Sequence, residues 1–99
     1  MKEIKIEIEG KEYKKTKFTG KDWLRMLEYT EAAGNNVLSK NFFEARYSLL
    51  SDMLEIPIDE LYSANLEDVT KIFKEIETGI TAVFFGVTPE EVNQMIAKK

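Results

Sequence analysis

The feature that most constrains the fold of this chain is one amphipathic hairpin pattern at its N-terminus, followed by sequence that favours helix throughout. Apolar and charged residues alternate with period two over residues 2–9, so one face of a strand turns to a core and the other to solvent. We assign the apolar positions, Ile4, Ile6 and Ile8, to packing of the hairpin on helices. A turn is predicted at Glu9-Gly10.

The returning strand of this hairpin starts at Lys11 and heads toward Phe18. Because Tyr13 and Phe18 lie on opposite parities, the strand must bulge or end early if both side chains are to be buried. Two strands alone are marginally stable in water. The hairpin is therefore either covered by helices of its own chain or completes a sheet with another chain through its open edges.

The first helix is predicted from a capping signal at its start. Thr19 and Asp22 have the spacing of a capping box, and the helix runs to about Ala33, where residues 34–36 provide a stop and a turn. Trp23 is interpreted as a core anchor under the hairpin rather than a ligand-stacking residue. The predicted apolar stripe of this helix is Trp23, Leu24, Leu27 and Thr30, with Met26 at one flank.

Two further main helices are predicted, over about 39–54 and 66–85. Each has a broad apolar stripe at helical spacing, and Asn65 caps the start of the longer one. Between them Pro57 breaks the chain, and one short turn of helix is predicted at 59–62.

Glycine and proline divide the C-terminal third of the chain. Gly79, inside the longest helix, predicts a bend or a close contact with another backbone. Gly86 ends that helix, and Thr88 with Pro89 begins a short one. The apolar face of this short helix is Val92, Met95 and Ile96.

These elements together predict one domain over residues 1–99, with a mainly α, α+β fold. It consists of an N-terminal β-hairpin over 1–18, a helical body over 19–85 that is a bundle of three main helices plus short helical turns, and a short C-terminal helix over 86–99. Isolated helices this short are marginal, so the last one is mobile unless it docks on the body or a partner orders it.

Composition excludes several classes of function. Eighteen acidic against fourteen basic residues give a net charge of −4, which opposes binding to nucleic acid. The sequence has no cysteine and no histidine, so disulfides, thiol nucleophiles, the usual metal ligands and the usual neutral-pH base are missing. We predict no enzyme activity, catalytic residue, cofactor or metal. No signal core or apolar membrane span is expected, and we expect a cytoplasmic location.

The acidic residues pair only at predicted helix starts, where the helix dipole favours negative charge. We therefore interpret Asp59-Glu60, Glu67-Asp68 and Glu90-Glu91 as structural rather than as general acid/base pairs.

The C-terminal region has more apolar surface than a small body readily covers. Phe84 and Phe85 are about 100° apart on a helix, so both are buried only if packing covers a wide arc. A wide internal core contact and a binding surface both remain open at this point. The candidate protein-binding residues are Ile80, Val83, Phe84, Phe85, Val92 and Ile96.

The order of these elements resembles the tail assembly chaperones of long-tailed bacteriophages and prophages of Gram-positive hosts, over about residues 4–85. The motifs that carry the resemblance are typical of a fold rather than of catalysis. They are IEIEGKEY (6–13), FTGKDW (18–23), IDELY (58–62) and LEDVTKI (66–72).

The resemblance implies a chaperone that binds the long tape measure protein in the cytoplasm of the infected host, keeps it soluble and helps the tail tube polymerise around it. The protein would be absent from the mature virion. The family commonly makes a longer frameshift product that recruits the tail tube protein, and this chain would be the short form. Homo-oligomers that coat an elongated partner fit this role.

Three other functions remain open for this sequence. An adaptor or inhibitor of a single host protein, acting through strand addition at the hairpin edge, is the main alternative. A DNA-binding regulator would use the helices over 20–33 and 39–54 as a helix-turn-helix, but Glu28, Glu31 and Glu44 oppose it. An enzyme is the last alternative.

Overall fold

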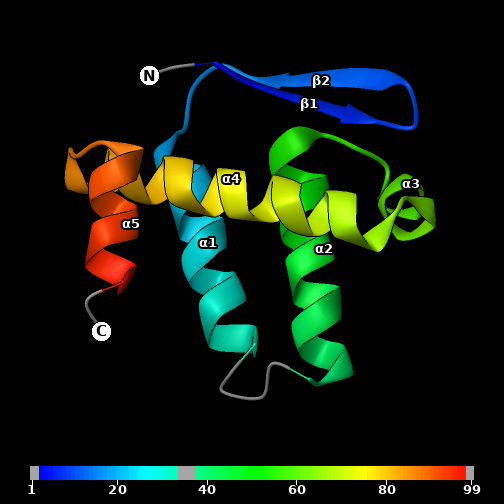
Figure 1. Cartoon of the computed structure of the whole chain (residues 1–99). Helices are drawn as coiled ribbons and strands as arrows, with labels where there is room; N and C mark the ends of the chain where they lie inside the picture. The colour runs from blue at the N-terminus through cyan, green and yellow to red at the C-terminus, as the bar shows by residue number, and fades with distance from the viewer. Residues whose placement is uncertain (1–2, 34–37, 98–99) are drawn as a thin grey trace.

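The computed structural model describes residues 3–33 and 38–97 (Figure 1). Within these residues the predicted class is confirmed: a two-stranded antiparallel hairpin precedes a mainly helical body, in which three helices are long and two are short. The predicted turn at 34–36 lies outside the described residues. The elements are β1 Ile4–Ile8, β2 Lys11–Lys15, α1 Gly20–Ala33, α2 Lys40–Leu54, α3 Ile58–Ser63, α4 Leu66–Phe85 and α5 Pro89–Ala97.

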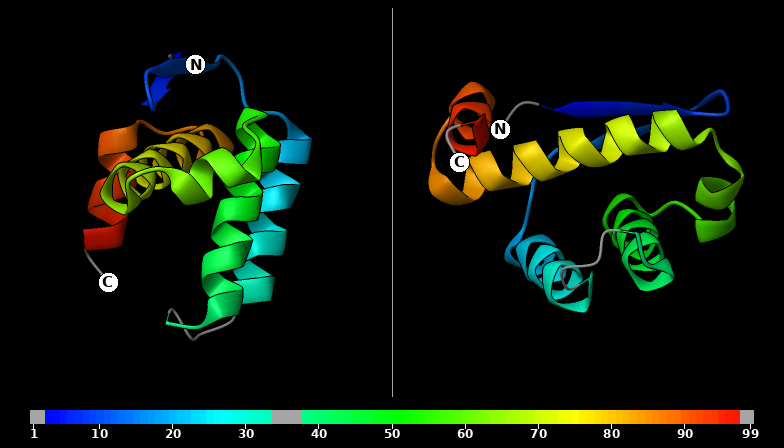
Figure 2. Two further views of the ribbon diagram at one scale, coloured as in Figure 1. Left: turned by 90° about the vertical axis from the view of Figure 1, so that its right-hand side faces the viewer. Right: turned by 60° about the horizontal axis from the view of Figure 1, so that its bottom comes forward.

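The long helices are arranged as an antiparallel pair crossed by a third helix. α1 and α2 lie side by side, and α4 crosses them near the end that carries the hairpin (Figures 1 and 2). The hairpin covers this crossing, with β1 against α4 and β2 against α2. The buried core residues of the hairpin, α1, α2 and α4 meet at this junction, and they include Ile6, Ile8, Met26, Tyr29, Leu50, Met53, Phe73 and Ile76.

The hairpin follows the sequence prediction at its turn and at its end. Glu9 and Gly10 have φ values of 50° and 79°, as a two-residue type I′ turn requires. β2 ends at Lys15, so Tyr13 and Phe18 both pack partly against the core without a bulge. One face of β1 is buried against the helices, which confirms that the chain covers its own hairpin.

Side-chain caps fix the helix starts that the sequence predicts. Ser39 accepts a hydrogen bond from the Phe42 N–H at the start of α2, and Asn65 accepts from two N–H groups at the start of α4. Two reciprocal capping boxes precede α1 and α5. Their donor–acceptor pairs are Thr19 N to Asp22 Oδ2, Asp22 N to Thr19 Oγ1, Thr88 N to Glu91 Oε1, and Glu91 N to Thr88 Oγ1.

The predicted apolar stripe of α1 is wrong for Leu24, Leu27 and Thr30, whereas Trp23 is half-buried and packs against the core, as predicted. Met26 and Tyr29 face the core, whereas Leu24 and Leu27 are 56% and 43% exposed. The Tyr29 ring contacts a ring of α2 at 5.7 Å and a ring of α4 at 5.3 Å, so these two helices select the Met26–Tyr29 side. Thr30 is also exposed, and its hydroxyl donates to the Met26 carbonyl.

Gly79 makes a close contact, but with side chains rather than with another backbone. A Cβ at this position would lie 3.1 Å from Ile4 Cδ1 and 3.2 Å from Phe18 Cε2. α4 continues through the glycine from Leu66 to Phe85, so Gly79 provides room for the hairpin and the segment after it.

α5 docks on the body. Gly86, with φ 69°, ends α4, and the Val87 N–H donates to the Ala82 carbonyl at 2.9 Å, which turns the chain back. Val92 of α5 is 1% exposed. The sequence left open whether this helix docks on the body or is ordered only by a partner, and in the structure it docks on the body.

Candidate functional site

Three aromatic rings meet where the first turn of α1 reaches the last turn of α4. The Trp23 and Phe84 rings stack with centroids 4.2 Å apart and planes 13° apart. The Phe85 ring meets the Phe84 ring edge to face at 5.1 Å. Phe84 and Phe85 are nevertheless 55% and 56% exposed, so the rings cover one another only in part and form a surface.

Two leucines extend this surface along α1. Leu27 follows Trp23 by one helical turn, and Leu24 precedes Leu27 by three residues, so all three lie on one flank of the helix. Contiguous exposed apolar side chains on a small protein are candidates for an interaction site. The α1–α4 apolar surface is defined as Trp23, Leu24, Leu27, Phe84 and Phe85.

The structure separates the six predicted protein-binding residues. Phe84 and Phe85 belong to the α1–α4 apolar surface. Ile80 and Val92 are each 1% exposed and pack inside the chain, so they offer no surface to a partner, which corrects the prediction for both. Val83 is 46% exposed but lines a different feature, a groove beside the hairpin. The side chain of Ile96 lies outside the described part of the chain.

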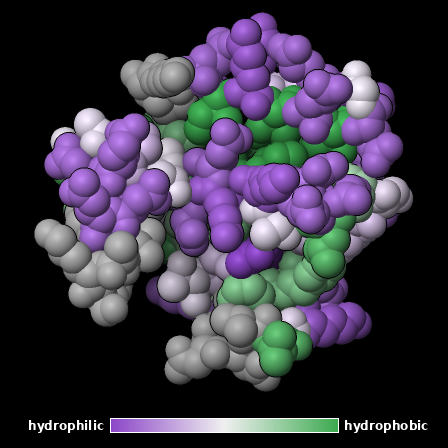
Figure 3. All heavy atoms as spheres, in the orientation of Figure 1, coloured by the Kyte–Doolittle hydropathy of each residue, from purple (hydrophilic) through white to green (hydrophobic). Residues whose placement is uncertain are grey.

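This groove, of about 890 Å³, lies between the start of β1, the outer side of α4 and the start of α5. Its apolar lining comes from the hairpin end and from the helices. In the space-filling view, apolar atoms are visible below the charged hairpin and above the charged outer side of α4 (Figure 3). The lining includes Glu3, Ile4, Lys5, Phe18, Lys74, Gly79, Ala82, Val83 and Val87.

The carboxylates nearest to other charged groups connect elements of the fold. Glu60 of α3 accepts hydrogen bonds from Lys11 at 3.0 Å and from the Tyr13 hydroxyl at 2.8 Å. Both bonds lower the pKa of the Glu60 carboxyl, and the bond from Lys11 has the larger effect. The Glu91 carboxylate likewise accepts hydrogen bonds from Thr88 at the start of α5, whereas Asp68 donates its backbone N–H to Asn65 at the start of α4.

One carboxyl has a raised pKa. Burial raises the pKa of the Glu77 carboxyl, and the positive charges of Arg46 and Lys74 oppose that increase only in part. The Arg46 guanidinium lies 4.2 Å from the centroid of the Phe73 ring and 5.0 Å from that of Phe42, as a cation–π contact. Within residues 3–33 and 38–97, no three acidic side chains gather closely enough to hold a metal ion.

Comparisons of this chain with protein-family models, with curated proteins and with solved structures find no match. Among the described helices, none combines the length and the apolar composition needed to cross a bilayer.

Sequence reasoning missed the α1 half of the candidate surface. The signal was present, because α1 has two apolar lines at helical spacing, one through Trp23 and Leu27 and one through Met26 and Tyr29. Periodicity alone ranks them equally, and the bulk of Trp23 and Leu27 favours burial of the first line. Only the folded chain shows that Leu24 and Leu27 are exposed beside a half-buried Trp23 and an exposed Phe84.

Proposed function

We propose that this chain is a phage tail assembly chaperone that binds and solubilises a tape measure protein in the cytoplasm of a bacterial host. It acts without catalysis and leaves before the virion is complete. A longer product, made by ribosomal frameshifting near the end of this reading frame, recruits the tail tube protein. The proposal rests on the family resemblance over about residues 4–85, and it assigns the partner to a specific surface.

The observation that supports this proposal best is the α1–α4 apolar surface. Five large apolar side chains lie together there, four of them exposed, beside a core formed by other residues of the hairpin and the helices. Trp, Phe and Leu side chains gathered where two helices meet suit the apolar stripe of a helical partner. An elongated, aggregation-prone helical protein presents many such stripes, so many copies can bind along it by mass action.

The experiment is co-expression of this chain with the product of the long gene downstream of it. We expect the long protein to be soluble only in the presence of this chain, and several copies of the chain to co-purify with it. Phe84→Glu and Leu24→Glu place a charge in the apolar surface and should each abolish this rescue. Leu24 is not one of the two stacked rings, so its variant separates partner binding from loss of the Trp23–Phe84 stack.

Leu66→Glu is the matched control. Leu66 is 61% exposed at the first residue of α4, away from the α1–α4 apolar surface, and an acid is favourable at a helix start. It should rescue the long protein as the wild type does, with the thermal unfolding of all three variants measured alongside. Equal rescue by Phe84→Glu and Leu24→Glu would refute the assigned surface. Binding of one copy to one unrelated host protein would favour the adaptor function.

A further inference from the structure

The hairpin register places like charges opposite each other on its solvent face. Lys5 lies across from Lys14, and Glu7 lies across from Glu12. Directly opposed like charges destabilise a strand pair. On β2 the charges compensate each other, since Lys14 Nζ lies 3.9 Å from Glu12 Oε1. Lys5 and Glu7 form no ion pair with any residue in 3–33 or 38–97.

The backbone groups of Lys5 and Glu7 point to the free edge of β1. A two-residue turn makes its flanking pair, Ile8 and Lys11, hydrogen-bonded, and bonded pairs then alternate along an antiparallel ladder. The bonding groups of Ile4, Ile6 and Ile8 therefore face β2. The N–H and C=O groups of Lys5 and Glu7 face outward, where β1 can pair with a further strand.

The two edges of the hairpin differ in protection. On the inner face of β2, Lys11 binds Glu60 at 3.0 Å and Lys15 binds Asp22 at 2.9 Å. Inward-pointing charges of this kind oppose the pairing of an edge with another strand. The inner face of β1 carries only isoleucines, so its edge lacks this protection.

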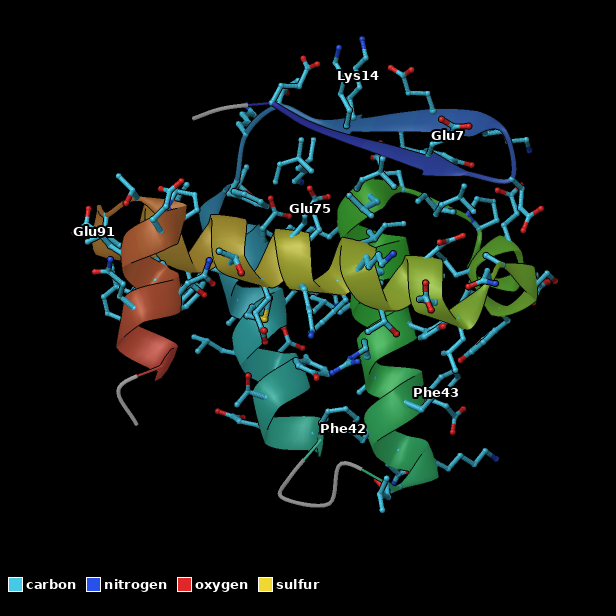
Figure 4. The ribbon with its side chains drawn as sticks, in the orientation of Figure 1. Glu7, Lys14, Phe42, Phe43, Glu75 and Glu91 are labelled. Carbon is cyan, nitrogen blue, oxygen red and sulfur yellow. The ribbon has the colours of Figure 1, made fainter. Side chains whose placement is uncertain are left out.

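Space next to the β1 edge is provided by the groove. On the strand side the groove is lined by Glu3, Ile4 and Lys5. Ile4 and Lys5 belong to opposite faces of β1, so the groove lies beside the edge of the strand rather than over one face. Glu75 stands between α4 and the hairpin, whereas Lys14 points away from the helices (Figure 4). The start of β1, at Glu3, Ile4 and Lys5, thus borders a partly apolar hollow.

We infer that β1 is a self-pairing edge, to which β1 of a second copy of this chain adds antiparallel about a two-fold axis at Ile6. This register puts Lys5 opposite Glu7 of the partner subunit, in both symmetry-related pairs. Both residues have outward backbone groups, so each such pair is hydrogen-bonded. On the inner face Ile4 meets the partner's Ile8, and the two Ile6 residues meet at the axis. The result is a four-stranded sheet ordered β2-β1-β1-β2.

Charge selects this register over its neighbours. A two-fold axis at Lys5 places two lysines opposite each other, and an axis at Glu7 places two glutamates opposite each other. Within β1, only the axis at Ile6 gives both Lys5 and Glu7 an opposite charge. Just outside the strand, this register places Glu3 opposite Glu9 of the partner subunit, where β1 has already entered its turn. The inference does not depend on the proposed chaperone function, because it requires only a second copy of this chain.

The test uses charge reversal with charge-matched controls. Lys5→Glu and Glu7→Lys each turn both intermolecular pairs repulsive, so each should weaken self-association about tenfold in sedimentation equilibrium. The double variant Lys5→Glu/Glu7→Lys restores opposite charges and should return to within about threefold of the wild type. Lys14→Glu and Glu12→Lys make the same net charge changes on β2 and should leave association within about threefold of the wild type.

Loss of folding cannot imitate this result. Lys5→Glu and Glu7→Lys remove the like-charge pairs inside the hairpin, so the monomers should unfold at an equal or higher temperature than the wild type. In a mixed-label sample, an isotope-filtered NOE between Ile4 and Ile8 methyls should appear, since four residues along one strand span about 13 Å. A wild type that stays monomeric up to near-millimolar concentration, a double variant that stays dissociated, or equal effects of the β2 controls would overturn the inference.

Discussion

The ammonium group of Lys15 lies 2.9 Å from the carboxylate of Asp22, and their side chains are only 16% and 12% exposed. The same ammonium donates to the Met53 carbonyl at 3.1 Å, near the end of α2. Asp22 also accepts the Thr19 N–H in the capping box of α1. One largely buried ion pair therefore joins the end of the hairpin to both α1 and α2.

Acid should weaken this junction. Burial opposes the charge on Asp22, but the hydrogen bonds from Lys15 and Thr19 outweigh it, so the pKa of the carboxyl is lowered from its ordinary 3.8. Its contribution to stability is complete above that unfolded-state value and is lost as pH falls through the folded pKa. Asp22→Asn should lower the free energy of unfolding at pH 7 by about 1–3 kcal/mol and flatten its decrease in acid. Urea unfolding between pH 7 and pH 2 measures the free energy of unfolding of the wild type and of the variant. If the two free energies fall in parallel with pH, the prediction is wrong.

Gly79→Ala tests the close contact between α4 and the hairpin. Alanine gains about 1 kcal/mol of helix propensity, but its Cβ would lie within 3.1–3.2 Å of Ile4 and Phe18. We expect the gain to be cancelled in the wild-type background and recovered in Ile4→Val, which removes the nearest methyl group. A double-mutant cycle by urea unfolding measures the coupling; strict additivity would show that Gly79 is not in contact with Ile4.

Trp23 reports on its own stack because it is the only tryptophan of the chain. Phe84→Ala exposes the face of the indole that Phe84 covers, so the emission of Trp23 should shift to the red. The stability cost should be about 0.5–1.5 kcal/mol, as for other aromatic pairs. Phe85→Ala is the control. The Phe85 ring packs on Phe84, the ring that stacks on Trp23, so its removal should leave the Trp23 emission nearly unchanged.

Val92 holds α5 on the body. Val92→Asp buries an unpaired charge and should release the helix, while the core formed by the hairpin, α1, α2 and α4 stays folded. Hydrogen exchange of the amides in α5 should accelerate, whereas those of α4 around Phe73 should keep their protection. Glu91→Gln, which keeps the buried face and alters only the capping box, should have a much smaller effect.

Local signals were sufficient for the ends of most elements. The turn at Glu9-Gly10, the cap at Asn65 and the end of α4 at Gly86 each depend on the conformational preferences or hydrogen bonds of a few neighbouring residues. The same holds for the early end of β2, which follows from the opposite parities of Tyr13 and Phe18. These features are readable in sequence because their causes lie within about one turn of chain.

The candidate site was predictable only in part, because exposure depends on which helix faces which. Phe84 and Phe85 were identified as adjacent aromatics, but the exposure of Leu24 and Leu27 was not, since two lines of α1 compete for the core. Ile80 and Val92 looked like surface candidates and are buried by the core and by α5 docking on the body.

The sequence by itself determined the hairpin, the caps, the order of the helices and the absence of cysteine and histidine, since these require only local preferences or composition. Only the tertiary structure decided that α4 crosses the α1–α2 pair, that Lys15 meets Asp22, and that Trp23 stacks on Phe84 at the surface. The physical reason is that apolar burial has no direction of its own. Which of two apolar lines is buried depends on how all the elements pack together.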